Sequence, residues 1–463
     1  MTSPAVVAVL QEDQRTLGGV VVGPPAVHQA LLRSFWDGTF ATVMVALTET
    51  FGIAAAVSLQ APSMAIALLG STPLLLGSLG QYFLPAFVDV RRARKRHVLF
   101  GVGLQALFLL GASLSGFLVR PFAAWAYVAL FAMAGACANV TTASWVSWMG
   151  ELVPPGIRAR HFAWRSRLFA YVNLSCALIA GLLAKNYSTH NAPWAFFTAI
   201  FACAGVARLG SHQMLRRQYD PPARPTSERP DWHARPSREF TKFCWAHAVV
   251  QGASAMSGPF FNVWYLRDLH FNYLALAVCS SCTLVGNIIS LPMWGRLADR
   301  IGSRATLRIT GLLVGLVPLP YLFLTSQLGV WLINFAAGIA WAGYNLVSFN
   351  YLLGTSENRD RTTLFSYASV VTGVMVFGMT LLGGFLATRL PPLFAYPLQG
   401  LFLLSAILRL LSLTFFFPRL REYDFAPHER GEGRPSSQDV FNEFPGYRVG
   451  LGLLRNFFRA FRG

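Results

Sequence analysis

The apolar residues of this chain are gathered into about twelve long blocks that contain almost no charge. A helix needs about 20 apolar residues to cross the roughly 30 Å hydrocarbon layer of a bilayer, and each block is about that length or longer. The blocks therefore predict an all-α membrane protein with twelve transmembrane helices. They lie at residues 32–57, 61–88, 97–119, 122–150, 161–184, 193–214, 241–265, 271–298, 305–326, 328–354, 362–388 and 394–417.

The composition and the charge pattern argue against a soluble protein. Only 13% of the residues are charged and 54% are hydrophobic, whereas soluble proteins carry about 25% charged residues. The formal net charge of +18 would suit a nucleic-acid-binding protein, but the basic residues recur in the short gaps between alternate apolar blocks. That alternation is the positive-inside pattern of membrane proteins, so we expect a lipid bilayer as partner and no nucleic acid.

The basic residues also predict the topology. If the N-terminus is cytoplasmic, 38 − 4 = 34 of the Lys and Arg residues lie at or near the cytoplasmic side. Both termini are therefore expected to be cytoplasmic, in a multi-pass protein of a cell membrane, with a bacterial inner membrane as the expected location. The four residues left in outside loops are Arg120, Lys185, Arg267 and Arg389.

A proline-rich segment between the sixth and seventh blocks, from Leu215 to Arg238, predicts a linker between two six-helix bundles. A second polar segment follows the last block, and residues 447–462 within it place arginines on one helical face and Leu and Phe on the other. Such a helix is expected to lie flat on the inner leaflet. The predicted divisions are a tail at 1–31, a bundle at 32–214, the linker at 215–240, a bundle at 241–418 and a tail at 419–463.

The two halves repeat each other at two places. Asp89 and Asp299 each end an apolar block, and an arginine follows each at the fifth position, Arg94 and Arg304. In the next loop on the same side, Arg-Ala-Arg at 158–160 follows an acid and a proline, and Arg-Asp-Arg at 359–361 follows an acid. The separations are 299 − 89 = 210 and 359 − 158 = 201 residues. Two matches at similar separations indicate a duplicated six-helix unit.

The second copy of this loop, Gly295-x-Leu-Ala-Asp299-Arg300-x-Gly302-x-Arg304, resembles a signature of the major facilitator superfamily. In that family the signature lies between helices two and three and is repeated between helices eight and nine. The resemblance implies two pseudo-symmetric bundles around a central cavity and transport by alternating access. The first copy departs from the signature, because Pro85 and Arg92 replace its glycines.

The resemblance also implies a gate made by the two loops. Asp89 would approach the start of the eleventh block near Thr362, and Asp299 the start of the fifth, where free N–H groups favour an anion. The arginines would pair with acids of the next loop, Arg94 with Glu151 and Arg304 with Glu357. The alternative is a set of exposed charges that only sets the topology. The predicted gate residues are Asp89, Arg94, Gly295, Asp299, Arg300, Gly302 and Arg304.

Polar and aromatic stripes mark the first, fourth, seventh and tenth blocks, which line the cavity in proteins similar to this family. At 100° per residue each stripe covers one helical face, and its tryptophans could stack on an organic substrate. The same residues could instead pack helix against helix. The predicted cavity residues are Thr42, Glu49, Trp145, Trp148, Gln251, Asn262, Trp341 and Asn345.

Glu49 is the predicted proton-coupling residue. A carboxylate deep in a span costs about 2.5–3.5 kcal/mol on insertion scales, and apolar surroundings favour its protonated form, so it could take up and release a proton. The alternative is a neutral glutamic acid hydrogen-bonded to a neighbouring helix. Asp37 is expected to pair with Arg33, Arg165 or Arg167 near the inner surface.

Arg208 and Arg409, near the ends of their spans, are expected to extend toward the cytoplasmic membrane surface. No arginine is therefore expected to lie buried in the middle of the membrane, where it would indicate an anionic substrate.

These observations predict a secondary-active transporter of a small organic solute, coupled to a proton gradient. A translocase of lipids or other amphiphiles and a receptor or scaffold that has lost transport are the two alternatives. The chain contains none of the hydrolase, P-loop or metalloprotease motifs. We therefore expect no enzymatic activity, no cofactor and no metal site, and we expect a monomer.

Overall fold

A computed structural model describes residues 24–87, 93–119, 122–153, 155–187, 193–220, 236–356, 361–393 and 395–420. Asp89, the middle of the linker and the C-terminal amphipathic segment lie outside these ranges. The described part is almost entirely helical, and its twelve long helices confirm the predicted fold class. They are α2 (Pro24–Ser58), α3 (Ser63–Phe87), α4 (Arg94–Leu114), α5 (Phe122–Leu152), α6 (Pro155–Tyr187), α7 (Pro193–Arg216), α8 (Arg238–Val263), α9 (Tyr273–Ile301), α10 (Ser303–Leu316), α11 (Gln327–Thr355), α12 (Arg361–Leu386) and α13 (Gln399–Phe416).

Eleven of these described helices are long and apolar enough to cross a membrane. The other one, α8, begins with charged side chains, among them Arg238, Glu239 and Lys242, and carries His247 and Gln251 farther along. It packs against α12 and α13 as the other spans pack against their neighbours. Polar side chains are tolerated in α8 because several of its sides contact other helices instead of lipid. The first helix begins at Pro24, inside the segment that the sequence assigned to a tail.

The described helices form two bundles with the same internal packing. In α2–α7, helix α4 packs on α5 and α7, α3 packs on α5, and α2 packs on α6 and α7. In α8–α13, helix α10 packs on α11 and α13, α9 packs on α11, and α8 packs on α12 and α13. Each contact of the first bundle recurs in the second with every helix shifted by six. This correspondence is the structural form of the duplication indicated by the loop motifs.

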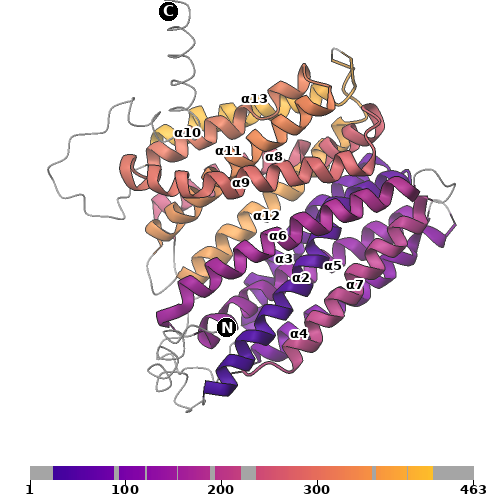
Figure 1. Ribbon diagram of the computed structural model, residues 1–463. Coiled ribbons are helices and arrows are strands. Elements are labelled where there is room, and N and C mark those ends of the chain that lie inside the picture. The colour runs from indigo at the N-terminus through magenta and orange to yellow at the C-terminus, as the bar shows by residue number, and fades with distance from the viewer. Residues whose placement is uncertain are drawn as a thin grey trace, which may run out of the picture.

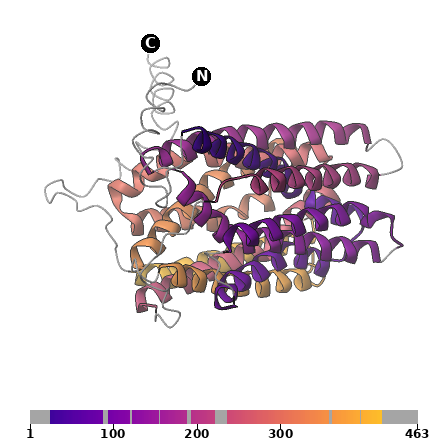
Figure 2. The ribbon, with the colours of Figure 1, turned by 90° about the horizontal axis from the view of Figure 1, so that it is seen from below.

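The two bundles lie side by side and meet along two helix pairs, α3 with α12 and α6 with α9. Figure 1 shows the indigo-to-magenta bundle below the orange-to-yellow one, with α6 and α9 at the boundary. Seen from below, the helices run alongside one another between the two ends of the molecule (Figure 2). We call the end where α2 begins and α7 ends the linker face, and the end where α9 begins the opposite face.

The hydrophobic core differs between the two faces. Toward the opposite face one cluster of buried residues runs through both bundles and includes Phe51 and Phe197 of the first and Phe260 and Phe402 of the second. At the same face the ring of Tyr273 stacks on that of Phe196 across the boundary, with centroids 5.8 Å apart. Toward the linker face the described buried residues instead form separate clusters, one around Trp148 in the first bundle and another around Tyr351 in the second. The bundles are therefore joined at the opposite face and separate toward the linker face.

Small residues bring α9 and α11 into close contact inside the second bundle. A Cβ atom added to Gly286 would overlap the carbonyl oxygen of Phe335, and one added to Gly338 would overlap that of Thr283. Small residues at helix contacts of this kind let two backbones approach closely inside a membrane. The polar stripe predicted on the tenth block is thus partly a packing surface.

We predict that Gly338→Ala lowers the stability of the protein by about 1–3 kcal/mol, because the new methyl group must push apart two rigid backbones. The matched control is Gly378→Ala in the middle of α12, where no heavy atom lies within 4 Å of an added Cβ. The control should be neutral or stabilising by up to about 1 kcal/mol, owing to the higher helix propensity of Ala. Thermal unfolding of both variants in detergent, followed by tryptophan fluorescence, measures the difference. Equal unfolding temperatures would contradict the packing argument.

Candidate substrate cavity

A cavity of about 1040 Å³ lies in the linker-face half of the molecule, between the two bundles. Its walls come from α2, α4, α5, α6 and α7 of the first bundle and from α9 of the second. Most of the wall is apolar, with side chains such as Val45, Val102, Leu284 and Ile288. The cavity lies where the cores of the two bundles have already separated.

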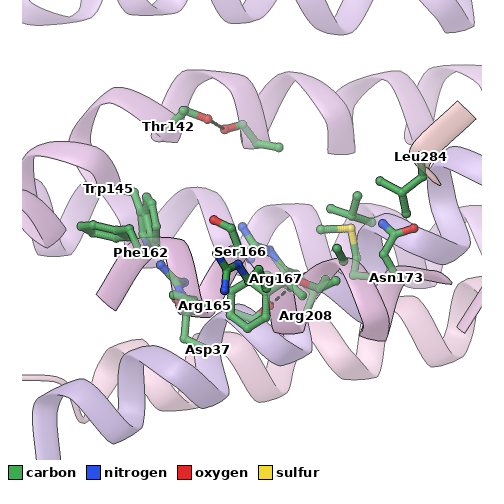
Figure 3. Close-up of a pocket in the computed structure, with 18 of the residues that line it drawn as sticks. Asp37, Thr142, Trp145, Phe162, Arg165, Ser166, Arg167, Asn173, Arg208 and Leu284 are labelled. Carbon is green, nitrogen blue, oxygen red and sulfur yellow. Dashed lines mark hydrogen bonds and ion pairs between the residues drawn. The ribbon is translucent and has the colours of Figure 1, made fainter. Parts of the chain in front are cut away.

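A cluster of charged groups occupies the wall formed by α2, α6 and α7 (Figure 3). The carboxylate of Asp37 accepts a hydrogen bond of 2.7 Å from the hydroxyl of Ser211, and an Nη atom of Arg165 lies 4.0 Å from its other oxygen. The guanidinium of Arg208 donates to Ser211 at 3.0 Å and to the side-chain oxygen of Gln105 at 2.7 Å. Ser211 therefore connects Arg208 to Asp37, and the predicted pairing of Asp37 with Arg165 is confirmed.

Arg165 is held in place mainly by aromatic rings. Its guanidinium carbon lies 5.0 Å from the ring centroid of Trp145 and 4.8 Å from that of Phe169. The residue is only 5% exposed, and its Nε makes no hydrogen bond with any described residue. Gly38 permits this arrangement, because a Cβ atom at that position would overlap both Phe169 and the guanidinium of Arg165.

The expectation that Arg208 and Arg409 extend toward the membrane surface is wrong. Arg208 points into the first bundle and lines the cavity. Arg409 is 2% exposed inside the second bundle, where its guanidinium donates to the carbonyl of Val314 and to the hydroxyl of Ser257, both at 3.1 Å. Hydrogen-bond acceptors inside each bundle therefore hold these cations away from the lipid surface.

The spacing of these two arginines in the sequence is a signal of their common role. The separation 409 − 208 is 201 residues, equal to the spacing of the Arg-x-Arg loops. An arginine that points into its bundle thus occurs at matching places in the two halves, and Arg208 is the one that borders the cavity.

Two of the eight predicted cavity residues line this cavity, Thr42 and Trp145. Trp148 does not, which corrects its prediction as a cavity residue. Its side chain is fully buried in the core of the first bundle, and its indole N–H donates to the carbonyl of Tyr219 at 3.1 Å. At 100° per residue the two tryptophans point about 60° apart, which is enough to turn Trp148 into the bundle.

Glu49 lies on the same face of α2 as Thr42 and Val45, within about 40° of both at 100° per residue, and farther from the linker face. Its side chain is exposed, and none of the described residues forms a hydrogen bond or ion pair with it. In this conformation the carboxyl group is therefore not a hydrogen-bonded tie between helices, which was the alternative to a proton-coupling role.

The four predicted cavity residues of the second bundle do not line the cavity described above. Gln251 and Asn262 lie on the face of α8 that carries Gly258, where no described atom lies within 4 Å of an added Cβ. On α11, Asn345 is exposed and the ring of Trp341 lies edge-on to that of Tyr344 at 5.8 Å. Their assignment to a substrate site stays a prediction.

The gate residues that the structure describes lie at the linker face. The guanidinium of Arg94 is buried and forms ion pairs of 2.5 Å with Glu151 and 3.0 Å with Asp220. The predicted pair of Arg94 with Glu151 is confirmed, and Asp220, at the start of the linker, is a partner that the sequence did not reveal. Arg304 donates to the carbonyl of Pro418 at 2.7 Å, and its predicted partner at position 357 lies outside the described residues.

The second copy of the signature forms the turn between α9 and α10. Gly302 has a φ of 85°, a left-handed conformation that strongly favours glycine, which explains its place in the motif. Asp299 and Arg300 are exposed, and Asp299 makes no hydrogen bond or ion pair with a described residue. No described atom lies within 4 Å of a Cβ added to Gly295. The proposed contact of Asp299 with the start of α6 stays a prediction for a conformation in which the linker face is closed.

Comparison with known proteins agrees with this geometry. Residues 243–461 match the sequence model described as Major Facilitator Superfamily. The second half of the chain is therefore similar to the major facilitator superfamily, and the fold of both bundles is the one found in its transporters. The matched region contains the better copy of the loop signature, and the first bundle, with its altered copy, carries the same fold. No curated protein matches the sequence.

Three solved structures of transporters share the superfamily fold with this chain. A mutant of the nucleoside transporter NupG aligns with a TM-score of 0.65 at 11% identity, over 85% of this chain and 100% of that one. A bacterial homologue of the iron transporter ferroportin, in an inward-facing state, aligns with a TM-score of 0.64 at 16% identity, over 85% and 98%. A D-xylose-proton symporter aligns with a TM-score of 0.60 at 15% identity, over 86% and 97%. At such identities the likeness concerns the fold alone.

We predict that Arg94→Gln lowers the stability of the protein by about 1–3 kcal/mol, because it removes the shared partner of two carboxylates. Glu151→Gln should cost less, since Asp220 remains, and the double variant should show a coupling of more than about 0.5 kcal/mol. The matched control is Lys242→Gln, whose ion pair with Glu239 at 2.8 Å joins two residues of one helix and leaves Lys242 40% exposed; it should stay within about 0.5 kcal/mol. Thermal unfolding in detergent measures all four variants. Additive effects of the two substitutions would contradict the pair.

Proposed function

We propose that this protein is a secondary-active transporter that moves a small organic solute by alternating access, coupled to protons. The observation that carries the proposal is a large cavity in the linker-face half of the molecule. It lies between two bundles that share one core at the opposite face and have separate cores at the linker face. Rocking one bundle against the other would close the linker face and open the opposite one.

Small residues along the bundle boundary support such a motion. A Cβ atom added to Gly384 of α12 would lie 2.9 Å from that of Ala67 on α3, and one added to Gly181 of α6 would lie 2.8 Å from that of Ala277 on α9. Surfaces without large interlocking side chains resist sliding less than knobs packed into holes. At the linker-face ends of α5 and α9, Gly150 and Gly295 face open space, which leaves room for close approach when that face closes.

The charge distribution supports the orientation of the transport cycle. Under the positive-inside rule the linker face would be cytoplasmic, because the loops of the opposite face carry few basic residues. The structure would then be an inward-facing state, and both tails would be cytoplasmic.

The position of Glu49 supports proton coupling. Its carboxyl group is on the cavity face of α2, beyond the residues that line the cavity. Closing the linker face would enclose this group, and enclosing a charged carboxylate in an apolar site is costly whereas enclosing a neutral one is much less so. A proton on Glu49 would therefore favour the change of state, which is the physical basis of coupling.

Alternating access is tested with Thr42→Cys in a chain whose six native cysteines are replaced. A membrane-impermeant maleimide should label this position from the linker face, and more slowly from the opposite face as the protein visits its other state. The control is Leu107→Cys, an exposed apolar position on α4 that should lie in lipid and stay unlabelled. Labelling from one face only, in oriented vesicles, would indicate a receptor or scaffold and reject the transport proposal.

Proton coupling is tested in the same background without knowledge of the substrate. We expect the labelling rate of Thr42→Cys from the opposite face, divided by its rate from the linker face, to rise as the pH falls, because protonation removes the charge of Glu49. Dividing the two rates corrects for the smaller thiolate fraction at low pH. Adding Glu49→Gln should make this ratio independent of pH and close to its low-pH value. Asp268→Asn, at the end of the short π-helical turn Trp264–Asp268 that follows α8 at the opposite face, is the control and should keep the pH dependence. A ratio that still depends on pH in Glu49→Gln would exclude the coupling role.

A further inference from the structure

The wall of the cavity carries more positively than negatively charged side chains. Three arginines line the cavity, Arg165, Arg167 and Arg208, and Asp37 is the only acid among the described lining residues. The sum is 3 − 1 = +2 on a wall that contains no other charged side chain in the described part. An excess of like charge in a site surrounded by lipid is unfavourable unless an ion of opposite sign compensates it.

Arg165 and Arg208 are held in place, but not all of their hydrogen-bond donors are used. Arg165 is fixed between the rings of Trp145 and Phe169, so its guanidinium is already ordered before any ligand arrives. Its ion pair with Asp37 is long at 4.0 Å, and its buried Nε makes no hydrogen bond with a described residue. Arg208 binds neutral oxygens of Gln105 and Ser211 through two of its nitrogens. Both groups therefore retain donors for an anion, which a planar guanidinium binds best as carboxylate or phosphate.

The rest of the cavity selects an organic anion over an inorganic one. Beside the charged cluster lie the aromatic ring of Phe162 and the apolar side chains of Leu284 and Ile288, and amides are supplied by Asn173 and Asn287. A volume of about 1040 Å³ is at the upper end of the usual range for small-molecule sites. An apolar body of several hundred cubic ångströms would displace water from this wall and be held by it.

We propose that the cavity binds an organic anion, with a carboxylate or phosphate ester group at Arg165 and Arg208 and an apolar or aromatic body against α5 and α9. This inference rests on the proposed function and names its substrate class. Asp37 then has a defined role as a competitor: it occupies the guanidinium of Arg165 weakly when the site is empty and is displaced by the anion. The competition predicts that substitutions of Arg165 and of Asp37 change anion affinity in opposite directions.

The experiment is isothermal titration of the full-length protein in detergent with matched probes. The anions are 2-naphthoate and 2-naphthyl phosphate, and their neutral counterparts are 2-naphthamide and 2-naphthol; titration into empty micelles is subtracted. We expect each anion to bind at least about tenfold more tightly than its neutral counterpart. The stronger of the two anions identifies the preferred head group. Equal affinity for anions and neutral probes would overturn the proposal.

Three variants test the site itself. Arg165→Gln should weaken anion binding by about tenfold or more, with partial recovery in Arg165→Lys, whereas Asp37→Asn should strengthen it. The control is Arg389→Gln, whose guanidinium stacks on Phe385 near the opposite face, 4.5 Å from the ring centroid; it should bind as the wild type does. If the cluster only stabilises the fold, Arg165→Gln and Asp37→Asn will both lower the unfolding temperature and neither will change the anion preference.

The outcomes separate this inference from the proposed function. Binding in detergent does not require transport, so anion selectivity without labelling of Thr42→Cys from both faces would reject transport and keep the site. Two-sided labelling without anion selectivity would keep transport and reject the organic-anion site.

Discussion

The apolar core at the opposite face is the contact on which the rest of the structure depends. In a bilayer the helices of each bundle gain little from hiding apolar surface, because lipid is as apolar as leucine, so association rests on close packing and on internal hydrogen bonds. The cluster that contains Phe51, Phe197, Phe260 and Phe402 provides such packing across the boundary. Because this contact lies at one end, the other end is left free to separate. The cavity is the space that results.

The lipid surroundings also determine how the charged groups inside the bundles are bound. A lone ionised group in lipid costs several kcal/mol, and the buried arginines are compensated in different ways. Arg94 binds two acids near the membrane surface, Arg208 and Asp37 share a serine, and Arg409 is bound by neutral oxygens inside the second bundle. The cavity wall carries three arginines and one acid among its described residues, so its excess positive charge faces open space, whereas the guanidinium of Arg409 is enclosed by oxygens of its own bundle. The two bundles therefore have the same fold and different electrostatic tasks.

Much of this architecture could be predicted from the sequence, because hydrophobic length is a strong signal over twenty residues. The twelve helices and the duplication follow from the residue patterns. The pair of Arg94 with Glu151 was implied by the family resemblance, and Arg165 was one of three candidate partners for Asp37. The side-chain directions of Arg208 and Arg409 could not be predicted, since a position two turns before a helix end is compatible with the lipid surface or the bundle interior. Trp148 was misassigned for a similar reason. Residues within one stripe, as predicted at 100° per residue, differ in direction enough that some face the cavity and others face the bundle core.

The residues of α9 that border the cavity have a consequence for selectivity. All charged groups of the described wall belong to the first bundle, while the second contributes only the α9 segment with Leu284, Asn287, Ile288, Leu291 and Pro292. A ligand would thus be bound mainly by the first bundle. Its fit against α9 would decide whether the two bundles can close around it. In such an arrangement the first half of the duplicated chain binds the charged group of the ligand, and the second half determines whether the cavity can close around the rest of it. Evolution could then alter which solutes are carried by changing one face of α9 while leaving the charged anchor intact.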